Sequence, residues 1–326
     1  MNEPNEIVQQ VEPARAALRG AVHHIPLLSF GSLGKRTGGE VYLKAENLQK
    51  TGSFKVRGAL YRLLNLREGE GREGVVTVSA GNHAQALAWA ARSARVPCTV
   101  VMPESASRAK IEASRAYGAT VVLRPDVYDA FSHALAFERD RGLLFVHPFD
   151  DPLVIAGQGT VGAEILEEVP DASTIVVPVG GGGLIAGIAA ACRARSPGTR
   201  IIGVEPEGAP ALHRSLQAGR PVRLDSVETI ADGLAAPMAG DFTYAIVRRW
   251  VEDVVLLTDE EIRAGLAFLL ERGKLLAEPA GAAAVAALLC GRIPVRRSER
   301  VVAVISGGNV DPGSLLALFP PDPREG

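Results

Sequence analysis

Short apolar runs rich in β-branched residues alternate with longer amphipathic stretches along the whole chain. Such runs are typical of buried strands, and the stretches between them carry apolar residues at helical spacing. In one stretch, Phe131, Leu135 and Phe137 share a side, and another begins with the capping box Thr258 and Glu261. The expected strands are 41–45, 74–78, 98–102, 120–123, 143–146, 174–179, 201–204, 254–257 and 301–305. The expected helices are 84–93, 107–117, 130–141, 155–168, 184–195, 259–272 and 280–289.

The regular alternation of strands and helices predicts an α/β fold in which helices cover both faces of parallel sheets. Neither an internal repeat nor a Ser/Gly-rich linker divides the chain. If there are two domains, we therefore expect them to share an interface and the chain to cross between them more than once.

The composition is that of an ordinary globular protein, with 47% hydrophobic and 22% charged residues and a net charge of −2. Basic residues are scattered, so we expect neither nucleic acid nor a membrane surface as a partner. The longest apolar stretch is interrupted by Pro178 and four glycines, which argues against a membrane span. Cys98, Cys192 and Cys290 are widely spaced and none forms C-x-x-C, so we expect no disulfide framework and a reducing, cytoplasmic setting.

The first candidate for chemistry is the segment 47–59, which follows an expected strand and contains Gly52, Ser53 and Lys55. Gly52 allows an unusual backbone turn, and Ser53 can cap the helix that follows. A lysine in the first turn faces the positive end of the helix dipole, and burial also disfavours its charge. Both effects lower the pKa of Lys55 and make its amine a better nucleophile for a Schiff base. Taken alone, this local sequence fits a surface lysine after an N-cap more simply.

Three further segments lie where an expected strand ends, which is the edge at which open α/β sheets bind ligands. They are 78–85, 178–184 and 304–309. Backbone N–H groups at a strand-to-helix junction bind carboxylate or phosphate. The second segment contains four consecutive glycines, which are entropically costly and make sense where the backbone must approach a phosphate closely. In isolation, His83 fits a locally hydrogen-bonded helix residue, and Ser306 is unremarkable.

The glycine segment also supports a rival interpretation. Gly181, Gly183 and Ala186 fit G-x-G-x-x-A, and Glu205 ends the next expected strand. This is a passable dinucleotide fingerprint, with the acid placed to hold a ribose. A nicotinamide-dependent dehydrogenase is therefore an alternative on this segment, although it leaves the other three segments unexplained.

Together, the four segments resemble the threonine dehydratase and serine racemase family of pyridoxal-phosphate enzymes, which share the tryptophan-synthase β fold. The resemblance runs from about Val41 to Asp311 and includes 154–160, 228–233 and 277–281. Agreement at this many ordered points is specific, whereas any one motif is weak. The resemblance implies a lyase of amino-acid metabolism that removes water from L-threonine or L-serine and yields a 2-oxo acid and ammonia.

The resemblance also implies roles for individual residues. It implies that Lys55 holds pyridoxal 5′-phosphate as a Schiff base and abstracts the Cα proton of the substrate. It places Phe54 near the ring, Asn82 on the ring hydroxyl and Ser306 at the pyridine nitrogen. The residues implied to hold the phosphate are Gly180, Gly181, Gly182, Gly183 and Leu184. The residues implied to border the substrate carboxylate are Ser79, Asn82 and His83.

Several positions depart from patterns seen in related enzymes. Serine racemases typically place a second serine just before the Gly-Asn-His, where this chain has Ala80, as dehydratases do. We therefore expect elimination rather than racemisation, with serine racemase as the alternative. Some relatives bind a divalent cation near the position of Glu205, but the second acidic ligand expected there is Ala211, so we expect no metal and interpret Glu205 as a capping or solvated residue.

The resemblance implies two doubly wound domains with the cofactor in the cleft between them. We expect residues 48–147 to form a small domain, and residues 1–47 and 148–326 to form a large one that holds the cofactor. The chain ends about fifteen residues after Asp311, so we expect a short form without the C-terminal regulatory domain of many relatives. We further expect a homo-oligomer that acts on a small amino-acid substrate. A non-catalytic cofactor-binding protein is disfavoured, because the carboxylate-site residues accompany the cofactor residues.

Overall fold

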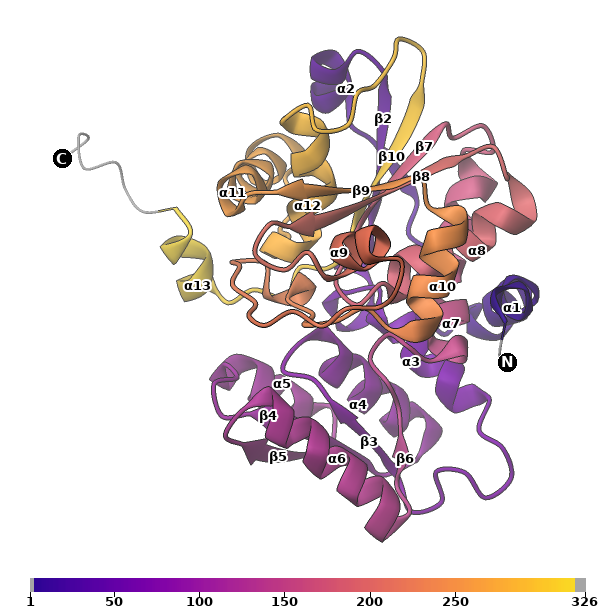
Figure 1. The fold of residues 1–326 in the computed structure, drawn as a ribbon, viewed down its shortest axis with the longest axis vertical. Coiled ribbons are helices and arrows are strands. Elements are labelled where there is room, and N and C mark those ends of the chain that lie inside the picture. Colours follow the sequence, from indigo (N-terminus) through magenta and orange to yellow (C-terminus); the bar gives the residue numbers. More distant parts are fainter. Residues whose placement is uncertain (1–2, 320–326) are drawn as a thin grey trace, which may run out of the picture.

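The computed structural model describes residues 3–319, and its strands form two sheets (Figure 1). The larger sheet has the order β1-β2-β10-β7-β8-β9, and the smaller has the order β5-β4-β3-β6. The strands of the larger sheet are β1 (Leu27–Ser29), β2 (Glu40–Ala45), β7 (Thr174–Pro178), β8 (Arg200–Pro206), β9 (Asp253–Leu257) and β10 (Arg300–Ile305). Those of the smaller sheet are β3 (Val75–Val78), β4 (Cys98–Pro103), β5 (Thr120–Arg124) and β6 (Leu144–Phe145).

The prediction of an α/β fold with parallel sheets is confirmed. All neighbouring strands pair in parallel except β1, which runs antiparallel to β2 at the edge of the larger sheet. The sequence pattern did not predict β1, because three residues are too few to show an alternation of apolar and polar positions. An antiparallel edge strand on an otherwise parallel sheet is common in doubly wound folds.

The helices follow the expected order, with differences at their ends and several additions. They are α1 (Pro4–Leu18), α2 (Gly31–Thr37), α3 (Lys55–Leu64), α4 (Asn82–Ala94), α5 (Arg108–Ala116), α6 (Val127–Arg141), α7 (Pro152–Glu168), α8 (Gly183–Arg195), α9 (Ala211–Ala218), α10 (Asp241–Trp250), α11 (Asp259–Phe268), α12 (Pro279–Leu289) and α13 (Pro312–Ala317). The capping box at Thr258 and Glu261 is present, but the expected helix 259–272 is α-helical only to Phe268. A π-turn follows, and Lys274 ends it with a φ of 55°. Within residues 3–319, no helix combines the length and apolar character of a membrane-spanning segment.

Alternate strand residues face opposite layers of helices, as the period of a β-strand requires. In the smaller sheet, Val76 and Val101 pack against α6, whereas Val75 and Val100 face the core that contains α3 and α4. In the larger sheet, one face packs against α2, α11 and α12, and the other against α1, α7, α8 and α10. One continuous apolar core therefore joins the smaller sheet to one face of the larger sheet.

The chain passes from the larger sheet to the smaller one after β2 and returns through α7. Helix α3 crosses α7 at a pair of glycines, where a Cβ on Gly157 would lie 2.6 Å from the Cα of Gly58. Only glycine permits so close an approach of two helix backbones. The crossing holds the start of α3, and with it Lys55, against the layer of helices on the larger sheet.

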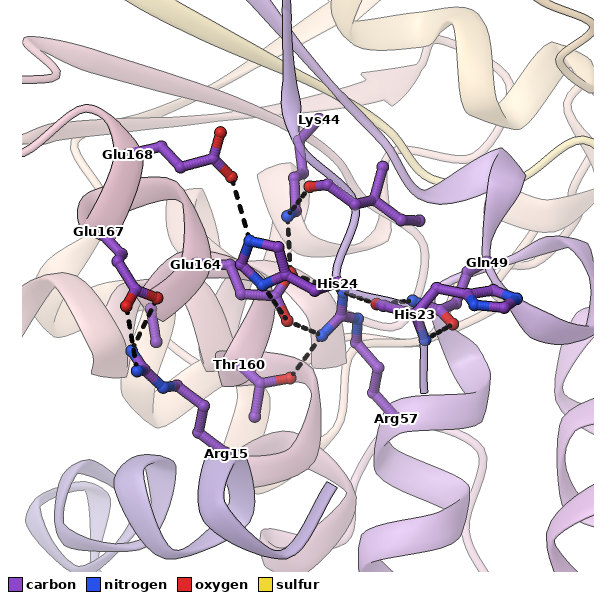
Figure 2. Close-up of polar contacts among 12 residues, drawn as sticks. Arg15, His23, His24, Lys44, Gln49, Arg57, Thr160, Glu164, Glu167 and Glu168 are labelled. Atoms are coloured by element: carbon purple, nitrogen blue, oxygen red, sulfur yellow. Dashed lines mark hydrogen bonds and ion pairs between the residues drawn. The ribbon is translucent and has the colours of Figure 1, made fainter. Parts of the chain in front are cut away.

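A buried cluster of charged side chains lies beside this crossing (Figure 2). Arg57 on α3 is fully buried and forms bidentate pairs with Glu46 and with Glu164 on α7, over distances of 2.6 to 2.8 Å. Lys44 on β2 donates to Glu164 at 2.6 Å, and Thr160 accepts from Arg57 at 3.1 Å. The two cations and two carboxylates thus connect α3, α7, β2 and the turn after β2.

The charges in this cluster depend on one another. Burial lowers the pKa of Arg57, but the carboxylates of Glu46 and Glu164 outweigh burial and raise it. Burial likewise raises the pKa of Glu164, and the charges of Arg57 and Lys44 outweigh that effect and lower it. Arg57 and Glu164 therefore stay charged because their partners are present. Removal of Arg57 leaves Glu46 without its ion-pair partner in the interior.

We predict that Arg57→Met lowers the free energy of unfolding by about 3–5 kcal/mol, because it leaves two buried carboxylates without their shared partner. The matched control is Arg200→Met, which breaks an exposed pair with Glu252 and should cost about 1 kcal/mol or less. Urea titrations of both variants measure the difference. Equal stability of the two variants would show that the cluster relaxes or takes in water when Arg57 is lost.

Candidate active site

A cavity of about 320 Å³ lies where the carboxyl ends of strands from both sheets face one another. It is bordered by the segments that follow β3, β7 and β10 and by the start of α3. The structure brings every site residue predicted from the sequence to its wall: Phe54, Lys55, Ser79, Asn82, His83, Gly180, Gly181, Gly182, Gly183, Leu184 and Ser306. These residues come from four distant parts of the chain, and the doubly wound topology alone makes them neighbours.

Lys55 is the first residue of α3, and its amine is enclosed in the cavity wall. The Lys55 Nζ donates to the backbone carbonyl of Pro148 at 2.8 Å. Burial lowers the pKa of Lys55 to about 8, while the nearby carboxyl of Glu278 opposes that shift. The predicted direction of the shift is therefore found, with burial as its main cause. A buried amine with this pKa is neutral in a useful fraction of molecules near neutral pH, which is what a carbonyl-attacking nucleophile needs.

The loop before Lys55 is held by backbone pairing rather than by the expected helix cap. Ser53 does not cap α3, because Phe54 is the N-cap and makes no side-chain cap bond. The Ser53 hydroxyl has no hydrogen-bond partner within residues 3–319. Instead, Ser53 pairs with Gly307, and the Phe54 N–H donates to the carbonyl of Ser306 at 3.1 Å. This long-range pairing brings Lys55 and Ser306 to the same cavity.

The glycine segment leads from β7 into α8 with its helix terminus uncapped. Gly182 is the N-cap residue, has a φ of 91° and supplies no side-chain acceptor. The first N–H groups of α8 are therefore free to bind an anion, and the helix dipole favours negative charge there. The glycines are also required by packing within the protein. A Cβ on Gly181 would lie 2.3 Å from the ring of Phe149, and the Thr243 hydroxyl donates to the carbonyl of Gly181 at 2.9 Å.

A second uncapped helix terminus lies at the start of α4. Gly81 is its N-cap and offers no side chain, and the Ser79 hydroxyl accepts from the Gly81 N–H at 3.1 Å. His83 is only 2% exposed, and burial, followed by the charge of Lys55, lowers its pKa well below the usual range. Its imidazole is therefore neutral. A carboxylate at this terminus would therefore meet backbone N–H groups and neutral side chains, and not a histidine charge.

Ser306 follows β10 and presents a neutral hydroxyl to the cavity. Its Oγ donates to the carbonyl of Ala280 at 3.4 Å, and the side chain is buried. A hydroxyl can donate or accept, so it can meet a ring nitrogen in either protonation state. It cannot hold that nitrogen protonated as a carboxylate would.

Among the wall residues that were not predicted as site residues are Glu278 and Phe149. Glu278 belongs to the segment 277–281, which had been recognised without a role, and it is 3% exposed in the cavity wall. Its carboxyl accepts from the Asn82 amide at 2.5 Å. Phe149 lies against the glycine segment and follows the carbonyl that holds Lys55. The sequence contains one hint of Glu278, because a glutamate just before Pro279 marks the start of a helix. That pattern does not show where the Glu278 side chain points.

The dinucleotide alternative fails at Glu205. Its carboxyl group is fully buried and accepts from the backbone N–H groups of Leu212 and His213, at 2.9 and 2.8 Å. It therefore caps α9, as one of the two expected roles had it. Both of its oxygens are engaged with the helix, so neither is free to hold a ribose.

The cavity fits pyridoxal phosphate. It combines a buried amine with a lowered pKa, an uncapped helix N-terminus suited to phosphate, and a neutral hydroxyl. The chain matches the family described as pyridoxal-phosphate dependent enzyme over residues 18–307. The chain belongs to this family. It is therefore an enzyme that uses pyridoxal phosphate.

Known proteins are similar to this chain over nearly its whole length. The L-threonine ammonia-lyase of Thermotoga maritima is 46% identical over 305 residues, which cover 93% of this chain and 76% of that protein. The solved structure of tomato (Solanum lycopersicum) threonine deaminase isoform 2, in its processed form, is 37% identical with a TM-score of 0.91, over 98% of this chain and 94% of that one. The structure of maize serine racemase is 36% identical with a TM-score of 0.91, over 95% of each chain.

We predict that covalent attachment of pyridoxal phosphate to the apoprotein becomes faster as pH rises and levels off above about pH 8. The reason is that burial lowers the pKa of Lys55 to about 8, so the neutral amine increases through that pH. Growth of the visible absorption band measures the rate, and a free alkylamine gives the pH dependence of the reagent itself. Borohydride should then fix the cofactor to Lys55, whereas Lys50→Ala should bind it normally. A rate that keeps rising to about pH 10 would contradict a buried Lys55.

Proposed function

We propose that this enzyme removes water from L-threonine, and also from L-serine, and releases a 2-oxo acid and ammonia. The proposal is carried by the 46% identity to an L-threonine ammonia-lyase across 93% of this chain, together with the buried Lys55 at the centre of the cavity. In this reaction the substrate loses the Cα proton and the β-hydroxyl. The enamine that is released tautomerises and takes up water, which yields the 2-oxo acid and ammonia.

The residues around the cavity have different roles in this reaction. Bound pyridoxal phosphate supplies an electron sink for the bond broken at Cα. Lys55 holds the cofactor and, once freed, takes the Cα proton at its Nζ. The uncapped N-terminus of α4, with Ser79, Asn82 and His83, receives the substrate carboxylate. The glycines of residues 180–183, with Leu184, receive the cofactor phosphate.

Phe54, Asn82 and Ser306 complete the proposed cofactor site. Phe54 lies in the cavity wall with its ring 5.3 Å from the Lys55 Nζ, where it shields the amine from water. Asn82 meets the ring hydroxyl, and Ser306 meets the pyridine nitrogen without fixing its charge. A ring that is not held protonated is a weaker electron sink. It favours rapid loss of the β-hydroxyl over reactions that need a long-lived carbanion.

Residues 48–147 are proposed to form a small domain that closes over the substrate. The smaller sheet lies wholly within this range, and Lys110 on α5 forms an ion pair with Asp232 across the cavity wall. Closure would exclude water from the reacting groups, as lids commonly do. A cytoplasmic location is supported by the buried free thiols of Cys98 and Cys192. That the enzyme forms a homo-oligomer stays a prediction.

We predict that the purified enzyme forms a 2-oxo acid from L-threonine and L-serine, and that Lys55→Ala abolishes this activity. Loss of general-base action alone is worth about 100- to 10,000-fold, and covalent attachment of the cofactor is lost with it. A keto-acid assay across both enantiomers of a panel of β-hydroxy amino acids measures the activity and the preference. Turnover of none of them by a yellow, cofactor-loaded enzyme would refute the proposed substrate class.

Serine racemase remains the second candidate, because the maize enzyme is a close structural neighbour. Ala80 separates the two functions, since it lines the cavity beside Ser79 and has no proton to give or take. We predict that the parent enzyme forms pyruvate from L-serine faster than it inverts L-serine. Ala80→Ser should raise inversion relative to elimination.

Chiral analysis of the remaining serine, alongside pyruvate formation, compares the two proteins. Ala80→Gly is the matched control, because it changes the size of this side chain without adding a hydroxyl. Inversion by the parent that is as fast as elimination would make racemase the better assignment.

A further inference from the structure

Glu278 occupies a helix N-cap position without capping the helix. It precedes α12, has an extended backbone with φ −82° and ψ 162°, and is followed by Pro279 at the first helical position. Yet its side chain makes no cap hydrogen bond, although side-chain oxygens at this position commonly accept from the first turn. The carboxyl is directed instead into the cavity wall, where it is almost fully buried.

A chain of side-chain amides fixes what this carboxyl contacts. The Asn309 Nδ2 donates to the backbone carbonyl of Thr51 at 2.7 Å and to the Asn82 Oδ1 at 2.8 Å. The carbonyl of Thr51 can only accept, so the amide of Asn309 must present its nitrogen. The Asn82 oxygen then accepts, and the Asn82 nitrogen is left to donate to Glu278 Oε1 at 2.5 Å. The orientation of Asn82 is thereby determined from both ends.

One N–H of Asn82 remains after these bonds are made. The amide nitrogen carries two hydrogens, and Glu278 uses one of them. Asn82 also lines the cavity, so its second hydrogen is available to a bound molecule. Without Glu278, the nitrogen end of the Asn82 amide would lose the acceptor that orients it.

We propose that Glu278 is a positioning residue, whose carboxyl holds the amide of Asn82 so that one Asn82 N–H is directed toward the bound cofactor. The inference rests on the proposed function only in assuming that pyridoxal phosphate occupies the cavity beside Asn82. It assigns to Glu278 an effect on cofactor binding that acts through Asn82.

The surroundings of Glu278 suit this role. A Cβ on Gly307 would lie 2.3 Å from Glu278 Oε1, so the carboxyl packs closely against the backbone next to Ser306. Burial, and next the charge of Asp232, raises the pKa of Glu278 to about 7. Oε1 can accept from Asn82 whether or not the other oxygen carries a proton. The contact with Asn82 therefore persists through the neutral pH range.

A double-mutant cycle of Glu278→Ala and Asn82→Ala tests the proposal. The measured quantity is the dissociation constant of pyridoxal phosphate, obtained by titrating each apoprotein and following the visible absorption band. A lost hydrogen bond to a carboxyl corresponds to roughly tenfold weaker binding for Glu278→Ala. In the Asn82→Ala background, Glu278→Ala should have almost no further effect, because a residue that acts through another is strongly non-additive with it.

Two further variants separate positioning from general damage to the fold. Glu278→Gln keeps an acceptor for Asn82 and should bind the cofactor within about threefold of the parent. Glu205→Ala is the matched control for Glu278→Ala, because Glu205 is also a buried glutamate with a raised pKa, about 8, but caps α9 away from the cavity. It should leave cofactor affinity unchanged.

Additive effects of Glu278→Ala and Asn82→Ala would overturn the proposal, and so would equal losses of cofactor affinity in Glu278→Ala and Glu205→Ala. Cofactor affinity does not depend on which amino acid the enzyme converts. An inactive enzyme that shows the predicted cycle would thus refute the substrate assignment and leave the role of Glu278 intact.

Discussion

Arg57 carries its charge in the protein interior, two residues after Lys55 on the same helix, and much of the site depends on how that charge is paired. Its partners Glu46 and Glu164 belong to the turn after β2 and to α7, so the pairing fixes α3 against both elements. Figure 2 shows the contact between Arg57 and Glu164. A buried ion pair adds little net stability compared with apolar packing, but an unpaired charge there is costly. We interpret the cluster as a device that specifies one docking of α3. The glycine crossing of α3 and α7 provides the close approach that this docking needs.

Backbone groups at two helix starts are available to bind anions in the cavity. Helices α4 and α8 both begin at glycines that supply no cap, so both termini have free N–H groups facing the site. Two such termini suit the two anionic groups of this chemistry, the cofactor phosphate and the substrate carboxylate. Lys55 is a basic group in the cavity wall, and burial lowers its pKa. A site built in this way binds anions without placing a permanent cation beside the reacting amine.

The polar side chains around the proposed ring position differ in how readily they lose a proton. Ser306 is neutral at any relevant pH, whereas Glu278 lies behind Asn82 with a pKa raised by burial. Because Asn82 lies between Glu278 and the proposed ring position, the Glu278 carboxyl can orient the Asn82 amide without competing for the substrate proton. This arrangement is consistent with a site in which Lys55 alone moves the Cα proton.

The sequence by itself determined the α/β class, most strand positions and the segments that form the cavity. It could do so because buried parallel strands need continuous apolar runs, and because glycines and helix starts at strand ends are local features. It did not predict the antiparallel strand β1 or the helices α1, α2, α9, α10 and α13. It also assigned to Ser53 a cap that Phe54 occupies instead. Only the tertiary structure decided that Gly181 packs on Phe149, that His83 is neutral and that Glu278 contacts Asn82 across 196 positions. Each of these depends on burial and on partners distant in sequence, and local pattern carries no information about either.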